Sequence, residues 1–241
     1  GAAQVVREAE RQGVAVIEDR TQCLYSGIAP LPSSFCMGSL RKWAGLPDGG
    51  FAVCCDGRLS MHPDGYDKDL EQAKLAASYA KYRYLFENIG EKSAFLDLYR
   101  RAEGILDQET AVYAISPAAV GIQTSLDLSA LSRHRRENYQ ILLDGMRGCQ
   151  WLRPIFPELP EDAVPLYLPV AVRGDRGDFQ RYLADASIYA PIVWPRPDML
   201  PPVCKEAETF YQQLLCIPVD QRYGPDDMGR IINTIKMFKG E

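Results

Sequence analysis

The sequence of 241 residues contains only two histidines, His62 and His134, and they stand far apart. So few histidines give little support for a histidine-based zinc site or for a cysteine–histidine nucleophile pair. The seven cysteines are odd in number, scattered, and without a Cys-x-x-Cys pair. This pattern is typical of reduced thiols, so we expect a cytoplasmic protein with neither a disulfide framework nor a bound metal ion.

Long apolar runs and an excess of positive charge are also missing. No apolar stretch approaches the length needed to cross a bilayer, no signal peptide opens the chain, and the formal net charge is −5. We therefore expect no membrane and no nucleic acid among the partners. Hydrophobic residues make up 46% of the chain, which is ordinary for a globular protein of one large domain or two modest ones.

The N-terminal part has the pattern of an α/β sheet. We expect a helix over residues 2–12 that is closed by Gly13. The apolar run "VAVIE", residues 14–18, predicts a buried parallel strand whose carboxyl end faces a site. Two further short strands are predicted over residues 34–38 and 50–55. These elements are too few for a complete doubly wound sheet, so we expect an incomplete one.

Helices predominate after residue 66, and strands return in the C-terminal part. The expected helices cover 67–90, 92–107, 127–146, 177–186, 204–214 and 225–239, and the expected strands cover 164–172 and 188–194. The last helix has the clearest pattern, because Pro225 stands at its start and Asp226 and Asp227 lie in its first turn.

Lys42 stands in the stretch "GSLRKWAGLPDGG", between a small polar turn and a glycine pair. A solvated loop lysine is the commonest reading of any lysine, and the Walker motif of a phosphate-binding lysine is absent. A third reading is a Schiff-base lysine, with Ser39 three residues earlier facing the same ligand. Ser-x-x-Lys also marks penicillin-binding enzymes, but their other motifs are missing here.

Asp19 closes the expected strand, so we expect its carboxylate to be partly desolvated and paired with a cation. A protonated pyridine nitrogen would be such a partner. The alternatives are a helix N-cap or a salt bridge to Arg20 or Arg41. Gln22 follows three residues later and could hydrogen-bond a ring hydroxyl, or it could be a plain loop glutamine.

Two stretches together resemble a known family. "VIEDRTQ" followed by "GSLRKWAGLPDGGFAV" resembles the DegT/DnrJ/StrS family of pyridoxal-phosphate-dependent (sugar) aminotransferases. The stretches "IYAPIVWPRP" and "AETFYQQLLCIPVDQRYGPDDMGRIINTIKMF" are similar to the closing strand, proline-rich turn, next strand and final helix of that family. The resemblance covers most of residues 3–238.

The resemblance implies an α/β protein of the fold type I PLP-transferase class. Residues 1–126 would form a partial PLP-binding large domain with an incomplete sheet and connecting helices, and residues 127–241 a C-terminal α+β small domain. Because the front part of the large domain has no counterpart, we expect an N-terminally truncated chain that alone binds cofactor weakly or not at all. A homodimer with active sites at the interface is implied as well.

Site roles are also implied by the resemblance. Lys42 would bond the cofactor, pyridoxal 5'-phosphate, and then shuttle a proton, while Asp19 would keep the pyridine nitrogen protonated. Gln22 would contact the ring hydroxyl. The family's usual phosphate-binding serine is replaced by Met37, so Ser39 is expected to supply that hydroxyl.

The implied reaction moves an amino group from a donor to a keto substrate, for which a nucleotide-linked keto-sugar is a candidate. Two alternatives stay open at this point. One is a non-catalytic domain of the same fold that acts in assembly, and the other is a different PLP reaction such as dehydration.

Overall fold

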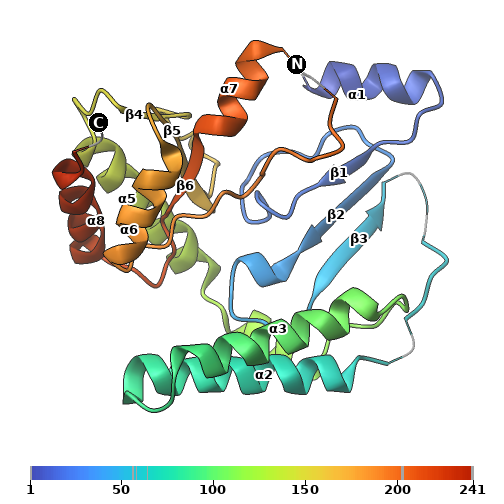
Figure 1. The fold of residues 1–241 in the computed structure, drawn as a ribbon. Coiled ribbons are helices and arrows are strands. Elements are labelled where there is room, and N and C mark those ends of the chain that lie inside the picture. The colour runs from blue at the N-terminus through green and yellow to red at the C-terminus, as the bar shows by residue number, and fades with distance from the viewer. Residues whose placement is uncertain (1, 56, 58, 64, 202–203, 240–241) are drawn as a thin grey trace. The chain divides into compact units, whose positions relative to one another are not determined.

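The structure is a computed structural model that describes residues 2–55, 57, 59–63, 65–201 and 204–239. The chain forms two compact units, each with helices and one small sheet (Figure 1). Unit 1 comprises Gly1–Leu24 and Ala29–Leu126, and unit 2 comprises Tyr25–Ile28 and Asp127–Glu241. The fold is therefore mixed α/β, as the sequence predicts.

The sheet of unit 1 has three strands in the order β1-β2-β3. They are β1 (Ile17–Asp19), β2 (Phe35–Ser39) and β3 (Gly50–Cys54). β2 runs parallel to β1 and antiparallel to β3. Because parallel strands end at the same edge of a sheet, Asp19 and Ser39 lie at one edge. The two strands predicted over residues 34–38 and 50–55 are confirmed to within one residue.

The strand predicted over residues 14–18 forms only in part: it pairs in parallel with β2, as predicted, but it is shorter and is not buried. The α1 helix (Ala2–Arg11) is followed by Gly13 in the left-handed region, as expected, but β1 has only three residues and begins at Ile17. Ile17 is 61% exposed. An apolar run indicates a buried strand only where other elements cover both of its faces, and β1 is the edge strand of a three-stranded sheet with Ile17 exposed.

The remaining regular elements of unit 1 after β3 are helical. They are α2 (Lys68–Tyr82), a π-helical turn (Arg83–Glu87), α3 (Lys92–Gln108) and α4 (Pro117–Ser125). α2 and α3 lie side by side (Figure 1). α3 agrees with its predicted range to within one residue, whereas the helix predicted over 67–90 is shorter, with α2 ending at Tyr82 and the π-helical turn at Glu87. The α4 helix was not predicted, although Ser116 and Pro117 give it a typical start: the Ser116 hydroxyl accepts a hydrogen bond from Ala119 N at 3.2 Å.

The described part of unit 2 contains an antiparallel sheet of order β4-β5-β6 and helices, three of which contribute side chains to one core. The strands are β4 (Leu152–Pro154), β5 (Tyr167–Val172) and β6 (Leu214–Pro218); the helices are α5 (Leu128–Gly145), α6 (Arg176–Asp185), α7 (Lys205–Gln213) and α8 (Pro225–Met237). Core side chains come from α5, α6, α8 and all three strands, and they include Leu142, Phe179, Val170, Ile217 and Met228. Within the described ranges, no helix is long and apolar enough to span a membrane.

The strand predicted over residues 188–194 is not formed. This segment is irregular, although Cys216 N of β6 donates a backbone hydrogen bond to Pro191 O at 3.0 Å. Pro191 and Pro195 have no N–H group, so the segment cannot form a continuous ladder. The helices predicted over 127–146, 177–186, 204–214 and 225–239 are confirmed within one or two residues at each end.

Candidate cofactor site

Three of the predicted site residues gather at one edge of the unit 1 sheet. Asp19 is the last residue of β1, Ser39 is the last of β2, and Lys42 ends the short 3-10 helix Leu40–Lys42. In the parallel register Asp19 lies opposite Met37. Since side chains alternate along a strand, Asp19, Met37 and Ser39 point to the same face of the sheet.

Thr21 holds this edge together through three hydrogen bonds. Its backbone N–H donates to Asp19 Oδ1 at 2.8 Å, and its hydroxyl accepts from Ser39 N at 2.9 Å. Its carbonyl accepts from Trp43 Nε1 at 2.7 Å, and the Trp43 ring is fully buried. The ends of β1 and β2 and the segment that holds Lys42 are therefore fixed to one another. Sequence reasoning missed Thr21, although a buried indole beside Lys42 requires an acceptor.

The glycine pair after Lys42 shapes the return into β3. Gly49 has φ +109°, a left-handed conformation that favours glycine, and its carbonyl accepts from Leu40 N at 3.2 Å. A Cβ added to Gly50 would lie 2.9 Å from the Gly38 carbonyl oxygen, so a side chain there would collide with β2. The pair thus allows a tight connection between the lysine and the next strand.

Asp19 is exposed, so the expectation that it is partly desolvated is wrong. One carboxylate oxygen accepts from Thr21 N in a local turn of the kind that Asp commonly makes. Neither alternative salt bridge forms, because Arg20 pairs with Glu18 at 3.0 Å and Arg41 lies 3.6 Å from Glu103. Across the described part of the chain Asp19 makes no ion pair, which leaves its second oxygen open to solvent.

The side chains of the other three predicted residues carry polar groups without an intramolecular partner among the described residues. Lys42 is exposed, whereas Gln22 and Ser39 are half-buried. Among the described residues, none of these three side chains has a hydrogen bond or an ion pair. An amine, a hydroxyl and an amide are therefore available for a ligand.

Glu103 of α3 adds a second carboxylate to the surroundings of Lys42. Partial burial alone would raise the pKa of Glu103, but the hydrogen bond from Lys74 and the charges of Lys74, Arg41 and Lys42 outweigh it and lower that pKa. Lys74 is buried and paired with this carboxylate. Sequence reasoning missed Glu103, since nothing in its local pattern relates it to Lys42. No cluster of His, Cys, Asp or Glu suited to a metal ion occurs in the residues that the structure describes.

Comparisons with known proteins agree with this fold. No family model and no curated protein matches the sequence. Among solved structures, the sugar aminotransferase CalS13 from Micromonospora echinospora is 23% identical, with a TM-score of 0.59 over 97% of this chain and 62% of its own. A DegT DnrJ EryC1 StrS aminotransferase from Brucella abortus is 17% identical, with a TM-score of 0.58 over 99% of this chain and 61% of its own. The chain has the fold of part of these aminotransferases.

A third structure, NtdA from Bacillus subtilis with the bound cofactor PMP, is 17% identical, with a TM-score of 0.59 over 98% of this chain and 53% of its own. This chain thus spans between about half and three-fifths of the length of these structures. At these identities the likeness establishes the fold, and it agrees with the resemblance that the motifs around Asp19 and Lys42 suggest.

Proposed function

We propose that this chain is the part of a pyridoxal-phosphate-dependent aminotransferase that holds the cofactor-bonding lysine, Lys42. The observation that supports this most directly is the parallel pairing of β1 and β2. It puts Asp19 and Ser39 on one face at one edge of the sheet, with Lys42 three residues beyond Ser39. The fold shared with sugar aminotransferases supports the same reaction class.

The available groups fit this cofactor chemically. Pyridoxal phosphate has an aldehyde, a ring nitrogen, a ring hydroxyl and a phosphate, and when bound it supplies an electron sink for bond changes at an amino carbon. Lys42 Nζ would hold the aldehyde carbon and, once free, would carry a proton as a general base. The open oxygen of Asp19 would hold a proton on the ring nitrogen by charge–charge attraction.

Ser39 and Gln22 would orient the bound cofactor. The thioether of Met37 cannot donate a hydrogen bond, so Ser39 Oγ is the hydroxyl on this strand end that can donate to a phosphate oxygen. The Gln22 side-chain amide would donate to the ring hydroxyl. Both side chains are half-buried and without partners among the described residues, so neither must break an existing bond to take these roles.

The proposed substrates are a small-molecule amino donor and a keto acceptor, with a nucleotide-linked keto-sugar as the candidate acceptor. We propose a cytoplasmic homodimer as the working enzyme. The remaining part of the fold, which the neighbouring structures have and this chain does not span, would complete the phosphate site.

The test is reductive trapping in the product of the whole gene that encodes this chain. After incubation with equimolar pyridoxal phosphate and borohydride reduction, peptide mass spectrometry should find the cofactor on Lys42. The same sample should show, before reduction, visible absorption that Lys42→Arg abolishes. These readouts measure attachment and do not depend on knowing the substrate.

Lys68 provides the matched control, because it is an exposed lysine of the same unit at the start of α2. Exposed lysines react weakly with any aldehyde, so Lys68→Arg should leave the labelling of Lys42 unchanged. Equal labelling of Lys42 and Lys68 would exclude a dedicated cofactor site and favour the non-catalytic alternative.

A further inference from the structure

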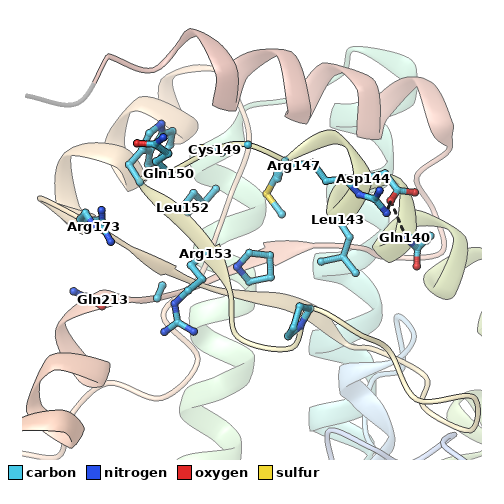
Figure 2. A pocket seen from close by; sticks show the side chains of 16 residues that line it. Gln140, Leu143, Asp144, Arg147, Cys149, Gln150, Leu152, Arg153, Arg173 and Gln213 are labelled. Carbon is cyan, nitrogen blue, oxygen red and sulfur yellow. Dashed lines mark hydrogen bonds and ion pairs between the residues drawn. The ribbon is translucent and has the colours of Figure 1, made fainter.

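Unit 2 contains a pocket of about 580 Å³ that no role in the proposed reaction uses (Figure 2). The end of α5, the loop of residues 146–151 that follows it and strand β4 form most of its wall. Its cationic and amide side chains are Arg147, Arg153, Arg173, Gln140, Gln150 and Gln213. The residues of the candidate cofactor site do not line it.

Two of the arginines face the same side of the sheet. Arg153 of β4 lies opposite Ala171 of β5, and Arg173 follows Ala171 by two residues. Because side chains alternate along a strand, Arg153 and Arg173 are diagonal neighbours on one face, roughly 7–8 Å apart at the backbone. A hydrogen bond of 2.7 Å from Arg173 N to Trp151 O extends the pairing to this position. Figure 2 shows both arginines and Gln213 on one side of the pocket.

These two guanidinium groups are exposed and, within the described residues, pair with no carboxylate. Arg147 differs, since it lies 2.7 Å from Asp144. The lining thus has three arginines against one acidic residue, in a chain whose net charge is −5. An anion bound between the two guanidinium groups would be attracted by both charges.

The charge and the shape of the donors select the class of anion. Two planar guanidinium forks match an acceptor that has several oxygens and two negative charges, which describes a phosphate monoester. A single carboxylate has one charge and two oxygens, so it satisfies one fork.

We propose that this pocket binds the phosphate group of a small phosphate monoester between Arg153 and Arg173, with the Gln213 amide as a further donor. The inference goes beyond the proposed aminotransferase reaction and requires none of its residues. It concerns unit 2 alone.

Titration of the full chain with inorganic phosphate, followed by amide nuclear magnetic resonance, tests the proposal. We expect saturable shifts at Leu152, Arg173 and the Trp151 indole, and smaller, non-saturating shifts with acetate at equal ionic strength. Arg153→Gln and Arg173→Gln should each weaken phosphate binding about threefold to tenfold, as for the loss of one partly exposed ion pair. Arg153→Lys keeps the charge but loses the planar guanidinium group, so its affinity for phosphate should lie between those of the wild type and Arg153→Gln.

Two controls separate this site from other sources of binding. Arg133 is an exposed arginine of α5 outside the pocket, and Arg133→Gln should leave the affinity unchanged. Ser39→Ala alters the candidate cofactor site and should also have no effect. Equal weakening by Arg133→Gln, or equal saturation by acetate, would overturn the proposal. Loss of binding in Ser39→Ala with the arginine variants unaffected would also overturn it, because the phosphate would then bind in unit 1.

Discussion

Arg135 shows how one buried charge can order several segments of unit 2. Its side chain is 1% exposed and donates from Nε to Gln221 Oε1 at 2.7 Å and from Nη1 to the carbonyls of Pro165 and Leu166 at 3.2 and 3.0 Å. Its Nη2 lies 3.3 Å from Asp220 Oδ2. Burial lowers the pKa of Arg135, and the charge of Asp220 opposes that shift. The planar fork reaches acceptors before β5 and after β6 from one position on α5.

Arg135→Lys should therefore destabilise unit 2 by about 2–4 kcal/mol, because one ammonium cannot reach these separated acceptors and leaves buried carbonyls unpaired. Urea unfolding followed by circular dichroism measures the loss. Arg222→Lys is the matched control: it also pairs with Asp220, but its side chain is 67% exposed, so a change of at most about 1 kcal/mol is expected. Similar losses in both variants would contradict the role assigned to burial.

At the scale of elements, α5 and α8 approach closely at a single glycine. A Cβ added to Gly145, the last residue of α5, would lie 2.6 Å from Ile232 Cγ1 and 3.0 Å from Ile232 Cγ2, and it would also overlap Cδ1. Ile232 is β-branched, so its side chain has few other rotamers in a helix. The absence of a side chain at Gly145 is thus a packing requirement of this helix pair.

Gly145→Ala should destabilise the protein by about 1–2 kcal/mol, since overpacking outweighs the gain of up to about 1 kcal/mol in helix propensity. Gly229→Ala in α8 is the control, because an added Cβ there meets nothing within 4 Å and should stabilise the helix. Thermal unfolding of both variants compares them directly. The double variant Gly145→Ala/Ile232→Ala should lose less stability than the sum of the losses in the two single variants. Strictly additive losses would show that the two side chains do not collide.

Helices with regular apolar spacing are the elements that the sequence predicts best. The helices α2, α3, α5 and α8 have apolar spacing that local pattern alone reveals, and the positions of Asp19 and Ser39 at strand ends follow from the same pattern. Whether a strand is buried depends on which elements cover it, which is why residues 14–18 were misread. The bonds of Thr21 and the approach of Glu103 to Lys42 depend on residues far apart in the chain, and no local pattern encodes them.

At the scale of the whole molecule, the two units differ in how completely their sheets are covered. In unit 2 the inner face of the sheet is fully buried against α5, α6 and α8. In unit 1 the apolar side chains of Ile17, Met37 and Val53 are exposed. Burial of apolar area is the main stabilising term in folding, so unit 2 should hold more of the protein's stability.

Hydrogen exchange should therefore be slower in β5 and β6 than in β1, β2 and β3. After correction for intrinsic rates, we expect at least about tenfold greater protection for the amides of Val170 and Ile217 than for those of Met37 and Val53. Exchange followed by mass spectrometry measures both sheets in one sample, so each serves as the reference for the other. Equal protection would contradict the link between coverage and local stability.

The connection from β1 to β2 determines how this protein can be divided into expression fragments. Within this connection, the four residues Tyr25–Ile28 belong to unit 2. There Ser26 Oγ accepts a hydrogen bond from Val164 N at 2.9 Å, and Gly27 N donates to Asp162 O at 2.8 Å. Unit 2 is therefore discontinuous along the gene, and no single cut can release it whole. An expression fragment that starts at Asp127 lacks one segment of unit 2. A fragment that contains the complete unit must therefore have Tyr25–Ile28 fused to it or added as a separate peptide.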